Sequence, residues 1–424
     1  MAAQSNSVTT AASLNRFWRK IQGNISKAFS HGKRAEKQLF DSLPAFEAPF
    51  SAYEVTFPLD LAERGGVASL TDGGHMAKPS SVNAVEATVS AQHFNARFAI
   101  SDIAKYADRG MENQLARQLV TQATQKVDAM VEHFSDYMHG AATGLLATTD
   151  SDISGTTGNV LTLTAGYGVA GITNAKYLAS LFKVGERVVL TDSSNALING
   201  ANSFAEITAV NKTNGTITVT MDGSTSYSTN GIRIYKANNL EGLTVAGGSD
   251  FNKGLVGFLD GFTAASLQNV ATSAQPNWSV AHSDTSAGRF THTKLRRGRD
   301  EIQNDGGLNA DTLLLAQGVY RDMIVQERAG LRYDDAGGLS FDGDVKAKGL
   351  KIVTTKNVPP GYAYLFAREA INKWEILPTT DRPTWGDLDP SETLAGAYGR
   401  VDWFGNLVWK NRKGLALFSS QTEA

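Results

Sequence analysis

The sequence predicts an α+β protein of several lobes, on three observations about its length and hydrophobic patterning. The chain has 424 residues, which exceeds the roughly 250–300 residues at which one hydrophobic core stops growing. A helical pattern without internal Gly or Pro covers residues 111–139. Short β patterns cover residues 150–237, and helical and β patterns mix between residues 238 and 380. These patterns predict one long helix, a β-rich insert and a mixed lobe.

The helix predicted over residues 111–139 carries a single apolar stripe. Its apolar residues recur at steps of three and four: Leu115, Leu119, Ala123, Val127, Met130, Val131, Phe134 and Met138. At ~1.5 Å per residue this helix is roughly 43 Å long, well beyond the average globular helix. A helix of this length with a narrow apolar face is expected to act as a rigid support (a strut), and an extended element is expected to lie along it.

Residues 1–50 are predicted to form a polar, basic arm. Between residues 1 and 40, seven Lys or Arg residues stand against one acid, Glu36. Apolar residues at helical spacing, from Leu14 to Ile25, predict an amphipathic basic helix within the arm. This helix either packs on its own domain, or lies across a neighbouring subunit, an acidic surface or a polyanion.

The pattern of residues 51–100 predicts a long two-stranded hairpin arm. Alternating apolar residues run outward over residues 53–59 and return over residues 85–89 and 94–100, and the tip between them is rich in turn-forming residues. Isolated two-stranded ribbons are marginal in water. Because such an arm has little to pack on within one chain, its strands are expected to gain partners from another molecule.

The segment 150–237 has few charges and many Thr, Gly, Ser and Asn residues. It contains four short β runs, Val160–Thr164, Glu186–Thr191, Ala205–Val210 and Thr216–Thr220. Asn214 and Gly215 between the last two runs are a strong hairpin-turn signal. Five or six strands at this spacing predict a small antiparallel barrel inserted directly after the long helix.

One segment formally matches a cofactor motif. Gly166–Gly171 has the glycine spacing of the dinucleotide fingerprint, and Asp192 follows at a distance suited to a ribose. The preceding run alternates apolar residues with Thr, as a half-exposed antiparallel strand does, and no second crossover helix follows. A glycine-rich turn in a β-domain is therefore the preferred interpretation.

The rest of the sequence contains no residue pattern typical of a catalytic, metal or cofactor site. The absence of cysteine excludes disulfides, thiolate metal sites and a Cys nucleophile. The seven histidines have no zinc-ligand spacing, and neither a nucleophile elbow nor a phosphate-binding loop occurs. We therefore expect no cofactor, no metal and no enzymatic activity. The net charge of −2 gives no general attraction to nucleic acid or membrane, and the absence of a signal peptide or spanning run predicts a soluble, cytoplasmic product.

A second charged stretch lies on the helix predicted over residues 291–305. Lys294, Arg296, Arg297 and Arg299 fall on or near one side of it. They either face a polyanion or pair with local acids such as Asp300 and Glu301, and the second interpretation is favoured because such runs are usually solvated helix faces.

The order of these parts resembles the major capsid proteins of tailed bacteriophages, which have the Hong Kong 97-type capsid fold. The sequence segments most similar to this family are Phe290–Leu295, Ala310–Leu315 and Gly349–Val353. The likeness divides the chain into an N-terminal arm (1–50), an extended loop (51–92), a peripheral domain with its spine helix (93–149), an inserted β-domain (150–237), an axial domain (238–397) and closing strands of the peripheral domain (398–424). The insert departs from the family pattern and is either a surface decoration or a latch between capsomers.

The resemblance implies a major capsid protein that self-assembles as hexamers and pentamers into the icosahedral head shell around packaged double-stranded DNA. Implied partners are portal, scaffolding and decoration proteins, and DNA by non-specific contact, but no membrane; the shell assembles in the host cytoplasm and ends in the virion. With no long helical leader before the arm, a scaffold is expected to be a separate protein. The residues expected at contacts between subunits are Arg16, Trp18, Lys20, Gly65, Gly66, Asp72 and Lys78, and those expected to face a polyanion are Arg296, Arg297 and Arg299.

Three alternatives stay open at this stage. The first is an encapsulin-type cellular nanocompartment shell of the same fold, which would hold cargo enzyme in place of DNA; the large insert favours a virion. The second is a nucleotide-binding enzyme that uses the Gly166–Gly171 loop. The third is a β-rich adhesion or tail protein, which the long helix disfavours.

Overall fold

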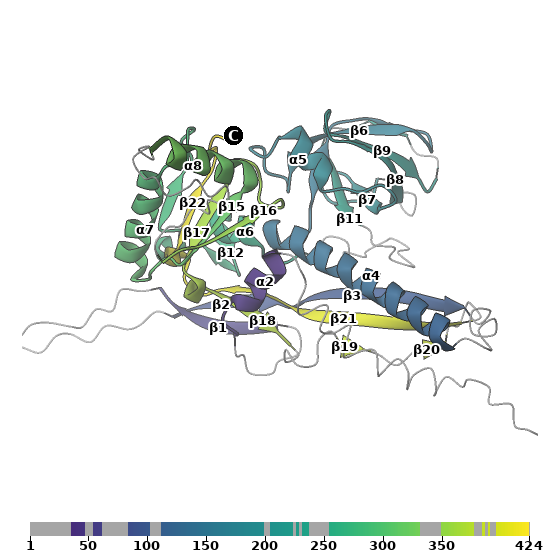
Figure 1. The fold of residues 1–424 in the computed structure, drawn as a ribbon, viewed down its shortest axis with the longest axis horizontal. Coiled ribbons are helices and arrows are strands. Elements are labelled where there is room, and N and C mark those ends of the chain that lie inside the picture. Colours follow the sequence, from purple (N-terminus) through teal and green to yellow (C-terminus); the bar gives the residue numbers. More distant parts are fainter. Residues whose placement is uncertain are drawn as a thin grey trace, which may run out of the picture. The chain divides into compact units, whose positions relative to one another are not determined.

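The structure, a computed structural model, describes residues 35–46, 54–61, 84–101, 112–198, 204–223, 226–228, 231–236, 254–330, 349–376, 384–385, 389–390 and 396–423. The chain forms two compact units. Unit 1 comprises Met1–Phe50, Ala91–Asp136 and Lys373–Asn406, and unit 2 comprises Ser51–Ser90, Tyr137–Asn372 and Leu407–Ala424. The elements named below are labelled in Figure 1 where space allows.

Unit 1 is organised around the long helix. The predicted helix is confirmed as α4 (Glu112–His139), whose 28 residues end in unit 2. The other elements of this part of the chain are α2 (Ala35–Ser42), β3 (Gln92–Ser101), β18 (Ile371–Glu375), β19 (Thr384–Trp385), β20 (Asp389–Pro390) and β21 (Gly396–Trp409). Strand β21 pairs with all four of the other strands. It pairs with β3 over ten residues, from Gln92 opposite Gly405 to Ser101 opposite Gly396.

This pairing corrects one prediction. Residues 94–100 were expected to be part of the returning hairpin arm, but they belong to β3 and pair with β21. The hairpin consists of β1 (Glu54–Asp60) and β2 (Ala84–Ser90), paired antiparallel from Glu54 opposite Ser90 to Asp60 opposite Ala84. Only Ala91 separates β2 from β3. Period-2 alternation identifies a strand but not its partner, so the sequence could not show this change of sheet.

Unit 2 contains the predicted antiparallel barrel, which is confirmed. Six strands close it in the order β11-β4-β6-β9-β8-β7. They are β4 (Ala147–Thr149), β6 (Asn159–Gly166), β7 (Arg187–Thr191), β8 (Phe204–Asn211), β9 (Thr216–Met221) and β11 (Ile232–Lys236). Alternate residues such as Leu161, Ile217 and Val219 fill the interior. The predicted turn at Gly215 joins β8 to β9 with a positive φ of 66°. Helix α5 (Ala175–Ser180) and the small strand pair β5 (Ile153–Ser154) and β10 (Ser226–Tyr227) complete the insert.

The remainder of unit 2 is a mixed α/β lobe. Its five-stranded sheet has the order β14-β22-β17-β15-β16. The strands are β14 (His282–Asp284), β15 (Thr312–Ala316), β16 (Lys351–Thr355), β17 (Ala363–Phe366) and β22 (Leu415–Phe418), and the helices are α6 (Phe258–Thr263), α7 (His292–Gly306) and α8 (Gln317–Gly330). The smaller elements are the hairpin β12 (Ser266–Leu267) and β13 (Val270–Ala271), and the 3-10 helices η3 (Pro276–Trp278), η4 (Arg368–Ala370) and η6 (Arg412–Gly414).

Close packing of α7 on this sheet requires a glycine. A Cβ atom added at Gly298 would lie 2.7 Å from the Phe418 ring, so the helix can approach β22 only without a side chain there. The strand β22 also corrects the predicted division of the chain, in which residues 398–424 close the peripheral domain. Residues 415–418 instead form an inner strand of the lobe sheet, and all four are buried, as expected for a strand covered on both faces.

Candidate assembly elements

An aromatic cluster binds α4 to its neighbours in unit 1. Phe134 of α4 packs edge-on against Trp403 of β21, with ring centroids 5.3 Å apart, and lies 6.3 Å from Phe94 of β3. Phe40 of α2 lies 4.9 Å from Phe134 and 5.8 Å from Trp403. The Trp403 indole N–H donates to Glu375 Oε1 at 2.9 Å. The β3–β21 pair is therefore an extended element in contact with the helix, and aromatic contacts at Phe134 hold the two together.

The end of the basic arm docks on unit 1. Phe40 and Leu39 are buried, and Lys37 pairs with Asp41 one turn later. Beyond the helix, the Phe46 N–H donates to the Lys373 carbonyl at 2.7 Å. Residues 35–46 of the arm are thus held within their own unit. The amphipathic helix predicted from Leu14 to Ile25 lies outside the described residues, so both interpretations of it stay open. Arg16, Trp18 and Lys20 lie outside the described residues, so their role in contacts between subunits stays a prediction.

The base of the hairpin also packs within its own chain. One face of the two strands is buried through Val55, Leu59 and Val89. The Thr88 N–H donates to the Gln268 carbonyl at 3.0 Å, and Asn277 Nδ2 donates to the Leu61 carbonyl at 2.8 Å. The expectation that the hairpin has little to pack on in one chain is therefore wrong for its base. The tip residues Gly65, Gly66, Asp72 and Lys78 lie outside the described part of the chain.

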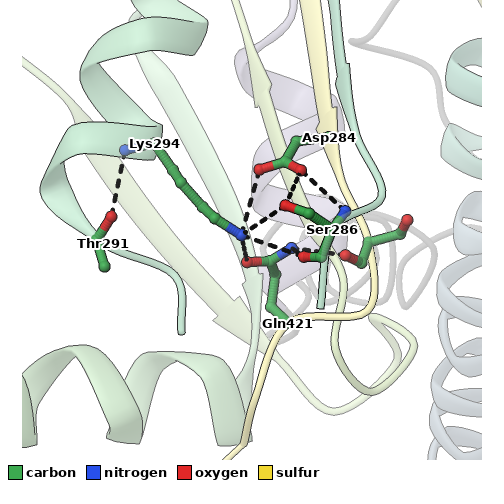
Figure 2. A network of polar contacts seen from close by, with 6 residues as sticks. Asp284, Ser286, Thr291, Lys294 and Gln421 are labelled. Atoms are coloured by element: carbon green, nitrogen blue, oxygen red, sulfur yellow. Dashed lines mark hydrogen bonds and ion pairs between the residues drawn. The ribbon is translucent and has the colours of Figure 1, made fainter. Parts of the chain in front are cut away.

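A polar network fixes the start of α7 to the C-terminal segment. Figure 2 shows the Lys294 ammonium between Asp284, Ser286 and Gln421. Its Nζ lies 3.2 Å from Asp284 Oδ2 and donates to Gln421 Oε1 at 2.9 Å and to the Ser286 carbonyl at 3.2 Å. Although burial opposes the change, hydrogen bonds from Ser286 and Lys294 hold the pKa of Asp284 below its ordinary value. Lys294 is therefore used within the subunit and is not a member of a polyanion-binding row.

The other basic residues of α7 divide between local pairing and exposure. Arg297 Nε donates to Glu301 Oε1 at 2.9 Å, and the other carboxylate oxygen lies 2.6 Å from Nδ1 of His282. These bonds lower the pKa of Glu301 although burial opposes them. Pairing with a local acid is thus confirmed for Arg297. Arg296 is exposed and Arg299 half-buried, and contact of the three arginines with a polyanion stays a prediction.

The Gly166–Gly171 loop has the geometry of a protein turn. Three of its N–H groups donate to carbonyls: Gly166 to Ile172 at 2.8 Å, Tyr167 to Leu146 at 2.9 Å and Val169 to Gly166 at 2.9 Å. Since these donors are used, they cannot cradle a phosphate. The carboxylate of Asp192, the expected ribose partner, accepts instead from the N–H groups of Ser194 and Ala196, at 2.8 Å each. The preferred interpretation as a turn in a β-domain agrees with this geometry.

The described residues show neither a metal-binding group nor a membrane-spanning helix. Within the described residues, no group of three or more His, Asp or Glu side chains is arranged to hold a metal ion. Among the same residues, no helix combines the length and the hydropathy needed to span a bilayer. Sequence reasoning missed the Lys294 network and a buried tyrosine cluster described below. Both join residues far apart in the chain, and no spacing rule could have indicated them.

Comparison with known proteins gives structural similarities only. No protein-family model and no curated protein matches the sequence. The capsid asymmetric unit of cyanophage A-1(L) is 10% identical, with 91% of this chain and 93% of the other covered at a TM-score of 0.49. The capsid structure of cyanophage P-SCSP1u is 8% identical, with 91% and 88% covered and a TM-score of 0.42. The holo-SrpI encapsulin complex of Synechococcus elongatus is 15% identical, with 38% and 59% covered and a TM-score of 0.28.

Proposed function

We propose that this chain is the major capsid protein of a tailed bacteriophage. In this role it self-assembles into the icosahedral head shell that encloses packaged double-stranded DNA, as a structural protein without enzymatic activity. Its main partner is itself, in hexamers and pentamers. Portal, scaffolding and decoration proteins are further partners, and the chain ends up in the virion after assembly in the host cytoplasm.

The observation that supports this proposal best is the architecture of the hairpin and the helix in one chain. The hairpin strands β1 and β2 end and begin at Asp60 and Ala84, and a 28-residue helix contacts a ten-residue strand pair through Phe134. A ribbon of two strands is marginal beyond the base that packs on its own lobe. Contacts with neighbouring copies would supply such a hairpin with further partners, and obligate interfaces commonly bury about 2,000–5,000 Å².

The proposal is tested by deleting residues 1–34. This change leaves α2 and Phe40 in place, so the subunit should fold, but its shells should not close to uniform size because the basic arm is gone. Circular dichroism measures the fold, and negative-stain microscopy with analytical ultracentrifugation measures assembly. Deletion of residues 1–40 is the matched comparison. It removes Phe40 from the aromatic cluster, and we expect it to destabilise the subunit itself.

Normal, uniform shells from the chain without residues 1–34 would contradict the role of the arm. A compact single copy of the full chain that never forms particles would contradict the proposed function as a whole. The contents of native particles distinguish the encapsulin-type alternative: nuclease-protected double-stranded DNA supports a virion shell, and a protein cargo without DNA supports a nanocompartment.

A further inference from the structure

A buried tyrosine cluster joins the barrel insert to the α/β lobe within unit 2. Tyr167 and Tyr177 come from the insert, Tyr362 and Tyr364 from the lobe, and none is more than 8% exposed. The Tyr177 hydroxyl donates to the Asn357 carbonyl at 2.7 Å, and its oxygen lies 3.3 Å from the Tyr167 hydroxyl oxygen. Since Tyr177 has one hydroxyl proton, Tyr167 must donate in the second bond. A chain of two hydroxyls therefore connects the insert to the lobe.

Two polar groups of the lobe side have no partner. The Tyr364 hydroxyl and the Asn357 amide nitrogen are both buried and without a hydrogen bond. Tyr364 is fully buried and Asn357 is 3% exposed. Buried polar groups are almost always satisfied, by protein or by ordered water, because leaving a donor unpaired in the interior costs its full desolvation penalty. Two such groups in one cluster indicate a ligand that the protein atoms do not supply.

Both groups belong to the same cluster. The backbone carbonyl of Asn357 accepts the Tyr177 hydroxyl. The Tyr364 ring lies 6.1 Å from the Tyr362 ring, between centroids. Burial raises the pKa of the Tyr364 hydroxyl far above its ordinary value, and the neighbouring hydroxyls of Tyr362 and Tyr167 raise it further. Tyr167, which bonds to Tyr177, thus also lies near the Tyr364 hydroxyl.

The chemistry of the cluster limits what can bind. Tyrosine hydroxyls and an amide are neutral, so they offer no counter-charge to an ion. The apolar part of the Tyr364 ring already packs on Phe262, at 4.9 Å between centroids, and on Phe258, at 6.0 Å. The ligand must therefore be small and uncharged, and it must both accept and donate hydrogen bonds. Water has these properties and is stably buried when it has two to four polar partners.

We propose that the tyrosine cluster is a buried-water site. Ordered water accepts from the Asn357 amide, bonds to the Tyr364 hydroxyl and connects both to the Tyr167–Tyr177 pair. The insert is thereby attached to the lobe through a hydrated network with directional bonds as well as through apolar contact. This site is a property of the subunit, so it holds or fails separately from the proposed shell function.

The direct test is an experimental density map of the full chain at about 2 Å resolution or better, where ordered waters are visible. We expect a peak within hydrogen-bond distance of Tyr364 Oη, with the Asn357 amide or the Tyr167 hydroxyl as its second partner. The proposal is overturned if the Tyr364 and Asn357 groups bond directly to protein atoms, or if the space around them is empty.

The variant Tyr364→Phe gives an independent test through the sign of its effect. If water binds the hydroxyl, the variant removes a satisfied group and lowers the thermal midpoint of the full chain by roughly 2–4 °C. If the hydroxyl is unpaired, its removal relieves a desolvation penalty, and the midpoint stays unchanged or rises; that result would overturn the proposal. Tyr320→Phe, on the half-buried face of α8, is the matched control and should leave the midpoint unchanged.

Discussion

The barrel insert and the β1–β2 hairpin are both antiparallel β structures, yet they differ in whether their edge strands have a hydrogen-bonded neighbour on both sides. The barrel closes six strands on each other, so every strand has two neighbours. The hairpin has two strands, and one face of this strand pair is buried at the base of the hairpin. The same local alternation thus produces one element that closes on itself and one whose two described strands pair only with each other. Under the proposed function, the hairpin is the element of the two that can gain partners from a neighbouring copy.

The largest effect is expected in the barrel core. Ile217 points into the closed barrel and is fully buried. Ile217→Ala should therefore lower the free energy of unfolding of the insert by about 2–5 kcal/mol, through lost transfer energy and a residual cavity. Chemical denaturation measures it. The control is Val160→Ala on the outer face, where the side chain is 53% exposed and the change should stay within about 0.5 kcal/mol. Equal losses in the two variants would contradict the closed barrel.

A smaller loss of stability, but a larger loss of assembly, is expected in the hairpin. Leu59→Ala removes a buried side chain near the point where the hairpin leaves its base. We expect a loss of about 2 kcal/mol, at the lower end of the range for such changes, because two strands can readjust more than a closed barrel can. The yield of closed shells, measured by ultracentrifugation, should fall more for Leu59→Ala than for Ile217→Ala. The opposite ranking would refute the contrast drawn between the two regions.

The attachment of the barrel should respond modestly to loss of one hydroxyl. Tyr177→Phe removes the donor to the Asn357 carbonyl and should cost about 1 kcal/mol, the usual net value of a hydrogen bond. The barrel core should be unaffected, so amide hydrogen exchange should increase at the joint and stay unchanged inside β6 and β9. Faster exchange throughout the barrel would show that the joint and the closed barrel are not independent.

The smallest expected effect is on the stability of the fold at acidic pH. The pKa of Asp284 is lower in the folded chain than its ordinary value of 3.8. The unfolded chain therefore binds this proton at a higher pH. The bonds from Ser286 and Lys294 to the Asp284 carboxylate contribute stability that is complete above the ordinary pKa and is lost as pH falls through the folded pKa. Between about pH 5 and pH 3, Asp284→Asn should lose less stability than the unchanged protein. Parallel unfolding curves for the two proteins across that window would contradict the role of Asp284.

Particular residues show how far sequence reasoning reached. The hydrophobic period predicted α4, α7 and four of the six barrel strands to within a few residues, whereas β4 precedes the predicted insert and β11 was not among the predicted runs. The Thr291 side chain caps α7 by accepting from the Lys294 N–H. The partner of β3 and the sheet to which β22 belongs were missed. The role of Lys294 was also missed, because its partners Asp284 and Gln421 are distant in the chain.

The sequence by itself determined the long helix α4, the helix α7 and four of the barrel strands, and that the insert is β-rich. These properties follow from local periodicity and from residue chemistry. Only the tertiary structure decided that the β3–β21 pair contacts α4, that the end of the arm docks through Phe40, and that a tyrosine cluster attaches the barrel to the lobe. Such contacts join residues far apart in the chain, and their energy depends on packing and desolvation, which no local pattern encodes.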